Sequence, residues 1–142
     1  MNKPHLLVAD PEYIIAMEAE RLLHDLMECD VTIINPHCAT DRLALSWTTY
    51  SLVMLDTGFC LGEIRVIAEL LQRQGIPVVF TTAHQAFTHG VPGFPTTPVV
   101  AKPYGQEQFA EAVLPLLRLA DRAEVYGEIG RSVIAEKPGS GP

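Results

Sequence analysis

Charged and hydroxyl side chains stand at the ends of four short apolar runs in this chain. Asp10 follows the run HLLVA, Asp56 ends the run SLVMLD, and Lys102 ends the run PVVAK. Thr81 and Thr82 end a fourth run, IPVVFTT. Two carboxylates suit Mg²⁺, whereas an ammonium and a hydroxyl bind anionic oxygens. Together these residue types are typical of phosphoryl transfer to an aspartate.

The runs that must position these residues are nearly continuous stretches of apolar side chains. They cover residues 5–9, 31–35, 51–56, 76–82 and 98–102. Continuous apolar runs indicate strands that are buried on both faces, as in a parallel sheet covered by helices. Helical spacing of apolar residues appears between them, over 12–28, 39–48, 62–74 and 106–119. This alternation predicts an α/β fold with right-handed crossovers, in which the polar strand ends meet at one edge of the sheet.

One crossover departs from this regular alternation. Residues 88–98 read THGVPGFPTTP, with three prolines and two glycines. Proline lacks a backbone donor and glycine is permissive, so we expect a loop where the fourth helix would lie. Pro115 stands inside the last helical pattern, where we expect a kink or a restart.

Length and charge limit the classes of protein that this chain could represent. Its 142 residues fit one domain, which we place at 1–122, followed by a partly disordered extension at 123–142. The net charge is −7 and no cluster of Lys and Arg exists, which argues against nucleic-acid binding. No apolar run approaches the roughly 18 residues of a membrane span, and the N-terminus lacks a signal-peptide pattern. We therefore expect a cytoplasmic protein without a membrane partner.

Four segments, in order, resemble the receiver domain of two-component signalling. LLVADPEYIIAMEAERLL resembles its first strand and helix, and LVMLD resembles the strand that ends in the phospho-acceptor, here Asp56. IPVVFTTAH resembles the fourth strand with its switch hydroxyl, here Thr82. VVAKPY resembles the fifth strand with Lys102 and Pro103, whose peptide bond is usually cis in that family. The resemblance covers about residues 5–120.

The resemblance implies a flavodoxin-like, doubly wound sheet of five parallel strands in the order 2-1-3-4-5. It implies that Asp56 accepts a phosphoryl group from a histidine kinase or phosphotransfer protein, with Thr82 and Lys102 contacting the phosphoryl oxygens. Thr81 would then point the other way along the strand. Mg²⁺ would be held by Asp10, Asp56 and the backbone carbonyl of Gly58.

The chain also departs from the pattern of the receiver family. Pro11 occupies the position of the second acid, so Glu12 becomes an alternative metal ligand if the turn lets it swing inward. Val99 occupies the position of the aromatic switch residue, three residues before Lys102. FTTAH followed by a Pro/Gly-rich loop partly resembles the FATGUY subgroup of stand-alone receivers, in which the fourth helix is poorly formed.

Two functions follow as hypotheses from these residues. The first is a single-domain response regulator, a phosphoprotein rather than an enzyme, that switches protein contacts or acts as a relay or phosphate sink. The second is a pseudo-receiver, a protein-binding module that is not phosphorylated, and Pro11 favours it. Retention of Asp10, Asp56, Thr82 and Lys102 favours the first. The downstream partner and the oligomeric state, homodimer included, stay open.

Overall fold

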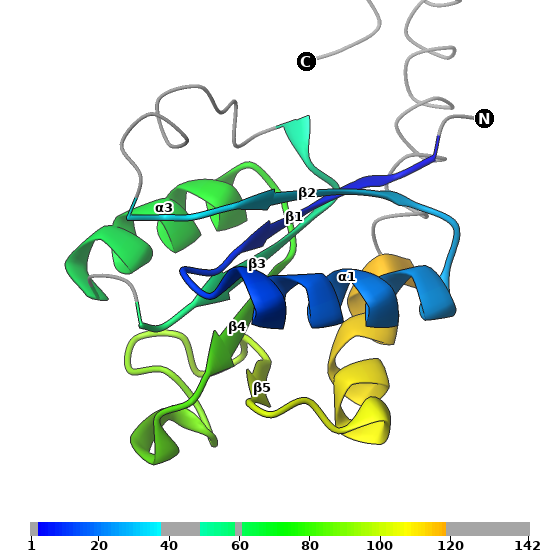
Figure 1. Ribbon diagram of the computed structural model, residues 1–142. Coiled ribbons are helices and arrows are strands. Elements are labelled where there is room, and N and C mark those ends of the chain that lie inside the picture. The colour runs from blue at the N-terminus through cyan, green and yellow to red at the C-terminus, as the bar shows by residue number, and fades with distance from the viewer. Residues whose placement is uncertain (1–2, 38–48, 59–60, 119–142) are drawn as a thin grey trace, which may run out of the picture.

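The computed structural model describes residues 3–37, 49–58 and 61–118 (Figure 1). The helix expected over 39–48 and the extension expected over 123–142 lie outside these residues, so both stay predictions. Within the described part, no helix is long and apolar enough to cross a membrane.

Five parallel strands form one sheet in the order β2-β1-β3-β4-β5, which confirms the predicted topology. The strands are β1 (His5–Ala9), β2 (Asp30–Ile34), β3 (Leu52–Asp56), β4 (Val78–Thr82) and β5 (Val99–Ala101). Strands β3 and β4 are buried along their whole length, as their continuous apolar sequences predict. The carboxyl ends of β1 and β3, the two strands that carry Asp10 and Asp56, are neighbours at the centre of the sheet.

Helices cover both faces of the sheet (Figure 1). Helix α1 (Tyr13–Leu26) and the helix of residues 106–118 pack on one face, and α3 (Leu61–Arg73) packs on the other. Helix α3 is followed by Gly75 at φ +75°, a left-handed conformation that favours glycine and ends the helix as predicted. The last helix continues through Pro115 to residue 118, so the expected restart does not occur.

Strand alternation divides the core into two layers. The α1 layer takes alternate strand residues, among them Leu6, Val8, Leu52, Met54, Val79 and Val100. The α3 layer takes the residues between them, among them Leu7, Ala9, Val53, Leu55, Val78 and Phe80. Because successive side chains of a strand point to opposite faces, the same alternation decides which layer each polar residue at a strand end faces.

The segment between β4 and β5 contains only the short 3-10 helix η2 (Gln85–Phe87) and turns. An isolated bridge joins Val91 to Phe94, and the Phe94 ring packs edge-on against Phe80 with 5.3 Å between ring centroids. The segment is therefore anchored to the core by an aromatic side chain, and the expected loop in place of a fourth helix is confirmed.

Candidate functional site

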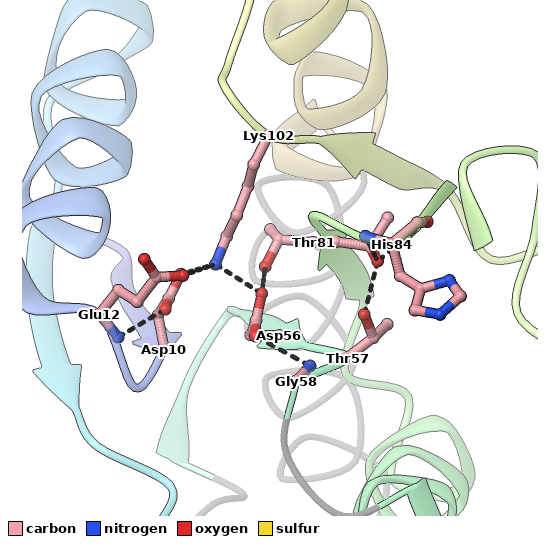
Figure 2. Close-up of polar contacts among 9 residues, drawn as sticks. Asp10, Glu12, Asp56, Thr57, Gly58, Thr81, His84 and Lys102 are labelled. Carbon is pink, nitrogen blue, oxygen red and sulfur yellow. Dashed lines mark hydrogen bonds and ion pairs between the residues drawn. The ribbon is translucent and has the colours of Figure 1, made fainter. Parts of the chain in front are cut away.

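A buried ammonium group joins two carboxylates at the carboxyl edge of the sheet (Figure 2). Lys102 Nζ lies 2.7 Å from Asp10 Oδ2 and 2.7 Å from Asp56 Oδ1. The side chains of all three residues are at most 5% exposed, so water screens these charges poorly. The structure thus brings together three of the predicted site residues, from the ends of β1, β3 and β5. The Lys102–Pro103 peptide bond is cis, as the family resemblance implies.

Burial and mutual contact displace the pKa values of this group. Burial is the main cause that raises the pKa of Asp10, and the nearby charge of Asp56 adds to it, against the lowering effect of Lys102. Burial alone would lower the pKa of Lys102, but its contacts with Asp10 and Asp56 outweigh burial and raise it. Lys102 therefore stays a cation at neutral pH, and the cluster keeps an excess of negative charge when both carboxylates are ionised.

Asp56 is held through both of its carboxylate oxygens. Thr81 Oγ1 donates a hydrogen bond of 3.0 Å to Asp56 Oδ1, and the backbone N–H of Gly58 donates one of 2.9 Å to Oδ2. A Cβ atom at Gly58 would lie 2.7 Å from Oδ2, closer than such atoms approach in proteins. Glycine at this position therefore leaves the space beside Oδ2 open.

Thr82 lies in a different hydrogen-bond network, with Thr57 and His84, two residues that Figure 2 labels. Thr57 Oγ1 donates a hydrogen bond of 2.6 Å to Thr82 Oγ1, which also accepts one of 2.9 Å from the backbone N–H of His84. In this structure the threonine that contacts Asp56 is thus Thr81, although we expected Thr81 to point away. The role of Thr82 toward a phosphoryl group stays a prediction.

Glu12 lies at the rim of the acidic cluster. Its side chain is 61% exposed, and Oε1 lies 3.5 Å from Lys102 Nζ. Its backbone N–H donates a hydrogen bond of 2.8 Å to Asp10 Oδ1, so Asp10 closes the turn that contains Pro11 and leads into α1. The turn therefore leaves the Glu12 carboxylate close to the site but in solvent, and its part as an alternative metal ligand stays a prediction.

Tyr104 is a neighbour of the site that sequence reasoning missed. Its ring packs edge-on against Phe109 at 5.3 Å, and its buried hydroxyl lies near the Thr81 hydroxyl without a well-formed hydrogen bond to it. Burial, followed by the charge of Asp10, raises the pKa of Tyr104 to about 12. Strand alternation could not have revealed it, because Tyr104 follows the end of β5 at Ala101, and only the structure places it against the α1 layer.

The donors at this edge fit a hydrated Mg²⁺ ion. Asp10 and Asp56 offer hard oxygens from adjacent strands, and Asp10 Oδ2 has no partner besides the ammonium of Lys102. Within the described residues, no three side chains of His, Cys, Asp or Glu form a ready metal-binding group. Because Mg²⁺ commonly keeps several waters, two carboxylates completed by water fit such an ion.

No protein-family model and no curated protein sequence matches the chain. Solved structures do match it. The PhyR stress response regulator has a TM-score of 0.57 and 26% identity, over 79% of this chain and 44% of that protein. The response regulator PhyR from Brucella abortus has a TM-score of 0.65 and 24% identity, over 89% and 52%. A response regulator receiver protein from Sinorhizobium medicae WSM419 has a TM-score of 0.63 and 23% identity, over 84% and 98%.

These likenesses, with the strand order, show that the chain has the fold of a response-regulator receiver domain. It spans about half the length of the two PhyR structures and corresponds to nearly the whole length of the Sinorhizobium receiver. The receiver is the fold of a signalling module rather than of a conventional enzyme.

Proposed function

We propose that this chain is a phospho-switch in which Asp56 accepts a phosphoryl group from a histidine kinase or phosphotransfer protein. The observation that carries this proposal is the contact of one buried ammonium, Lys102, with both Asp10 and Asp56 at 2.7 Å. A strand end that only closes a fold has no need for two buried carboxylates and a lysine, because desolvating such charges costs several kcal/mol per ion.

The reaction replaces a bond to nitrogen with a bond to oxygen. A carboxylate oxygen of Asp56 attacks phosphorus, the P–N bond of the donor's phosphohistidine breaks, and the imidazole leaves with a proton. Lys102 Nζ lies 2.7 Å from Asp56 Oδ1, so its positive charge would partly neutralise the negative charge of the incoming phosphoryl oxygens. Water is largely excluded from the attacking group, because Asp56 is only 4% exposed.

Mg²⁺ would neutralise charge on the transferring group when it is bound. We propose Asp10, Asp56 and the backbone carbonyl of Gly58 as its ligands, with Glu12 as a further carboxylate at the rim. With Mg²⁺ held by these groups, Lys102 would be available to contact the phosphoryl oxygens. Because Lys102 follows β5 directly, a change in its contacts would alter the end of that strand.

The output of the switch is a change in protein contacts. Thr82 would leave the hydroxyl of Thr57 to contact the new phosphoryl oxygens, and the segment from His84 onward would follow, because its backbone N–H is bonded to Thr82. This is a shift between two conformations that is driven by a local change of charge.

Intact-mass spectrometry tests the proposal. The folded protein is incubated with acetyl phosphate or phosphoramidate, with Mg²⁺ or with EDTA, beside Asp56→Asn and Asp10→Asn variants. We expect one phosphoryl adduct that needs Mg²⁺, is absent in Asp56→Asn and is reduced in Asp10→Asn. An adduct that persists in Asp56→Asn would place the acceptor elsewhere and refute the assignment.

The alternative is a pseudo-receiver that binds a partner without phosphorylation. Pro11 favours it, because the position offers no second carboxylate beside Asp10. If neither small donors nor phosphorylated histidine kinases yield an adduct while the protein stays folded, this alternative replaces the phospho-switch.

A further inference from the structure

The side chains of two adjacent threonines at the end of β4 point to opposite faces of the sheet. Thr81 shares the alternation of Val79, which belongs to the α1 layer, and Thr82 shares that of Phe80, which belongs to the α3 layer. Both threonines are almost completely buried, at 2% and 0% exposure. Their hydroxyls therefore work in separate surroundings although the residues are neighbours in the chain.

The register of the sheet places Thr81 directly beside Asp56. The two residues are Cα partners in the parallel pairing of β3 with β4, and Asp56 shares the alternation of Met54, also in the α1 layer. The hydrogen bond of 3.0 Å from Thr81 Oγ1 to Asp56 Oδ1 follows from this register. It joins two regular strands and does not depend on the conformation of a loop.

We propose that Thr81 is a positioning residue for the carboxylate of Asp56. Oδ1 receives Lys102 and Thr81, and Oδ2 receives the backbone N–H of Gly58. Lys102 has a long side chain and a second carboxylate to contact, so it restrains the rotation of Asp56 weakly. Thr81 has a short β-branched side chain on a buried strand, and its hydroxyl fixes Oδ1 from a rigid base.

The consequence is that Oδ2 stays on the side where Gly58 leaves open space. Without the Thr81 hydroxyl, the carboxylate is free to rotate about its Cβ–Cγ bond while Lys102 follows it. Oδ2 then leaves the N–H of Gly58, and the oxygen presented to a phosphoryl donor is no longer defined. Misplacing a reacting atom in this way slows a reaction without removing any group that touches the donor.

The expected change in phosphorylation rate rests on the proposed function, whereas the expected change in the orientation of the Asp56 carboxylate does not. Three variants separate these: Thr81→Val removes the hydroxyl at nearly constant shape, Thr81→Ser keeps a hydroxyl, and Thr97→Val removes a buried hydroxyl that is bonded to Gln72 instead. The geometric readout is the NMR signal of the Gly58 amide without any phosphoryl donor. The kinetic readout is the rate of adduct formation at saturating Mg²⁺, with Thr97→Val as a control for a buried threonine outside the site.

We expect the Gly58 amide signal to move in Thr81→Val and to return in Thr81→Ser, while Thr97→Val leaves it near its wild-type position. We expect phosphorylation of Thr81→Val to be roughly tenfold slower at unchanged Mg²⁺ affinity, restored by serine and unaffected in Thr97→Val. A Gly58 signal that Thr81→Val leaves unmoved overturns the inference, even if no variant is phosphorylated. A moved signal with a wild-type rate overturns the positioning role, whereas absence of phosphorylation in the wild-type protein contradicts only the proposed function.

Discussion

Lys102 Nζ lies 2.7 Å from Asp10 Oδ2, and this carboxylate oxygen has no other hydrogen-bond partner. The ammonium also lies 2.7 Å from Asp56, so one cation balances two buried anions. In such a cluster, loss of the single cation leaves two buried anions without compensation. The stability of the fold and the chemistry of the site therefore share the same three side chains.

Replacing Lys102 with methionine should destabilise the protein by about 3 kcal/mol at neutral pH, because two buried carboxylates lose their common cation. Urea unfolding followed by circular dichroism measures the loss. Lys3→Met is the matched control, because Lys3 is half exposed and its ion pair with Glu28 lies at the surface, where such pairs contribute less than about 1 kcal/mol. Equal effects of the two substitutions would contradict a buried ionic cluster.

Asp10→Asn should stabilise the protein, and increasingly so as the pH rises from about 4 to 7. The pKa of Asp10 is raised in the folded state, so the folded protein binds this proton more tightly than the unfolded chain does. The group therefore favours folding fully below its unfolded value of 3.8, and this contribution is lost as the pH rises through the folded pKa. Asparagine keeps the acceptor for the Glu12 N–H and removes the charge.

We expect a gain of about 1 kcal/mol at neutral pH, the scale of a single-site effect. Thermal or urea unfolding of both proteins across this pH range provides the measurement, with exposed Asp25→Asn as the control. A difference between wild type and Asp10→Asn that stays constant with pH would show that ionisation of Asp10 does not oppose folding.

Most of the fold could be predicted because burial on two sides marks the three inner strands β1, β3 and β4. Strand β1 matches the apolar run 5–9. Strand β4 (Val78–Thr82) lies inside the apolar run 76–82 and is buried throughout. The missing fourth helix was evident from the prolines and glycines of 88–98, since neither residue type favours a helix interior. Local sequence and tertiary contacts agree at these places.

The same property of the strands concealed part of the site. A strand that is apolar on both faces carries no alternating pattern, so the sequence does not show which of Thr81 and Thr82 faces Asp56. The pairing of Asp56 with Thr81 decides it, and that register depends on the whole sheet. Tyr104 was missed for a related reason, since an aromatic residue after a strand is equally typical of ordinary core packing.

Tyr104→Phe should leave the stability unchanged or raise it slightly, whereas Tyr104→Ala should lower it by about 3 kcal/mol. The buried hydroxyl has no well-formed hydrogen bond, only the Thr81 hydroxyl nearby, so removing it costs little, but the ring packs against Phe109. Urea unfolding compares the two variants. A loss of more than about 1 kcal/mol in Tyr104→Phe would reveal a hydrogen bond of the hydroxyl.

Absorbance at alkaline pH tests the environment of this hydroxyl independently. The chain has four tyrosines, and Tyr104 should lose its proton late, at a pKa of about 12, because it is buried and near Asp10. The late phenolate signal should disappear in Tyr104→Phe. Its persistence in that variant would assign the raised pKa to another tyrosine.

Thr57 and Thr82 should show energetic coupling, because each hydroxyl is the buried partner of the other at 2.6 Å. Thr57→Val and Thr82→Val should each destabilise the protein by about 1–2 kcal/mol, with the larger loss in Thr82→Val, which also leaves the N–H of His84 without its acceptor. The double variant should lose about 1 kcal/mol less than the sum of the single losses, because the first substitution has already broken the contact between the two hydroxyls. Thr57→Val combined with Thr97→Val, which shares no hydrogen-bond partner with it, should be additive within about 0.5 kcal/mol. If the Thr57 and Thr82 losses are also additive, the short hydroxyl contact contributes nothing to folding, and Thr82 is already free to turn toward Asp56.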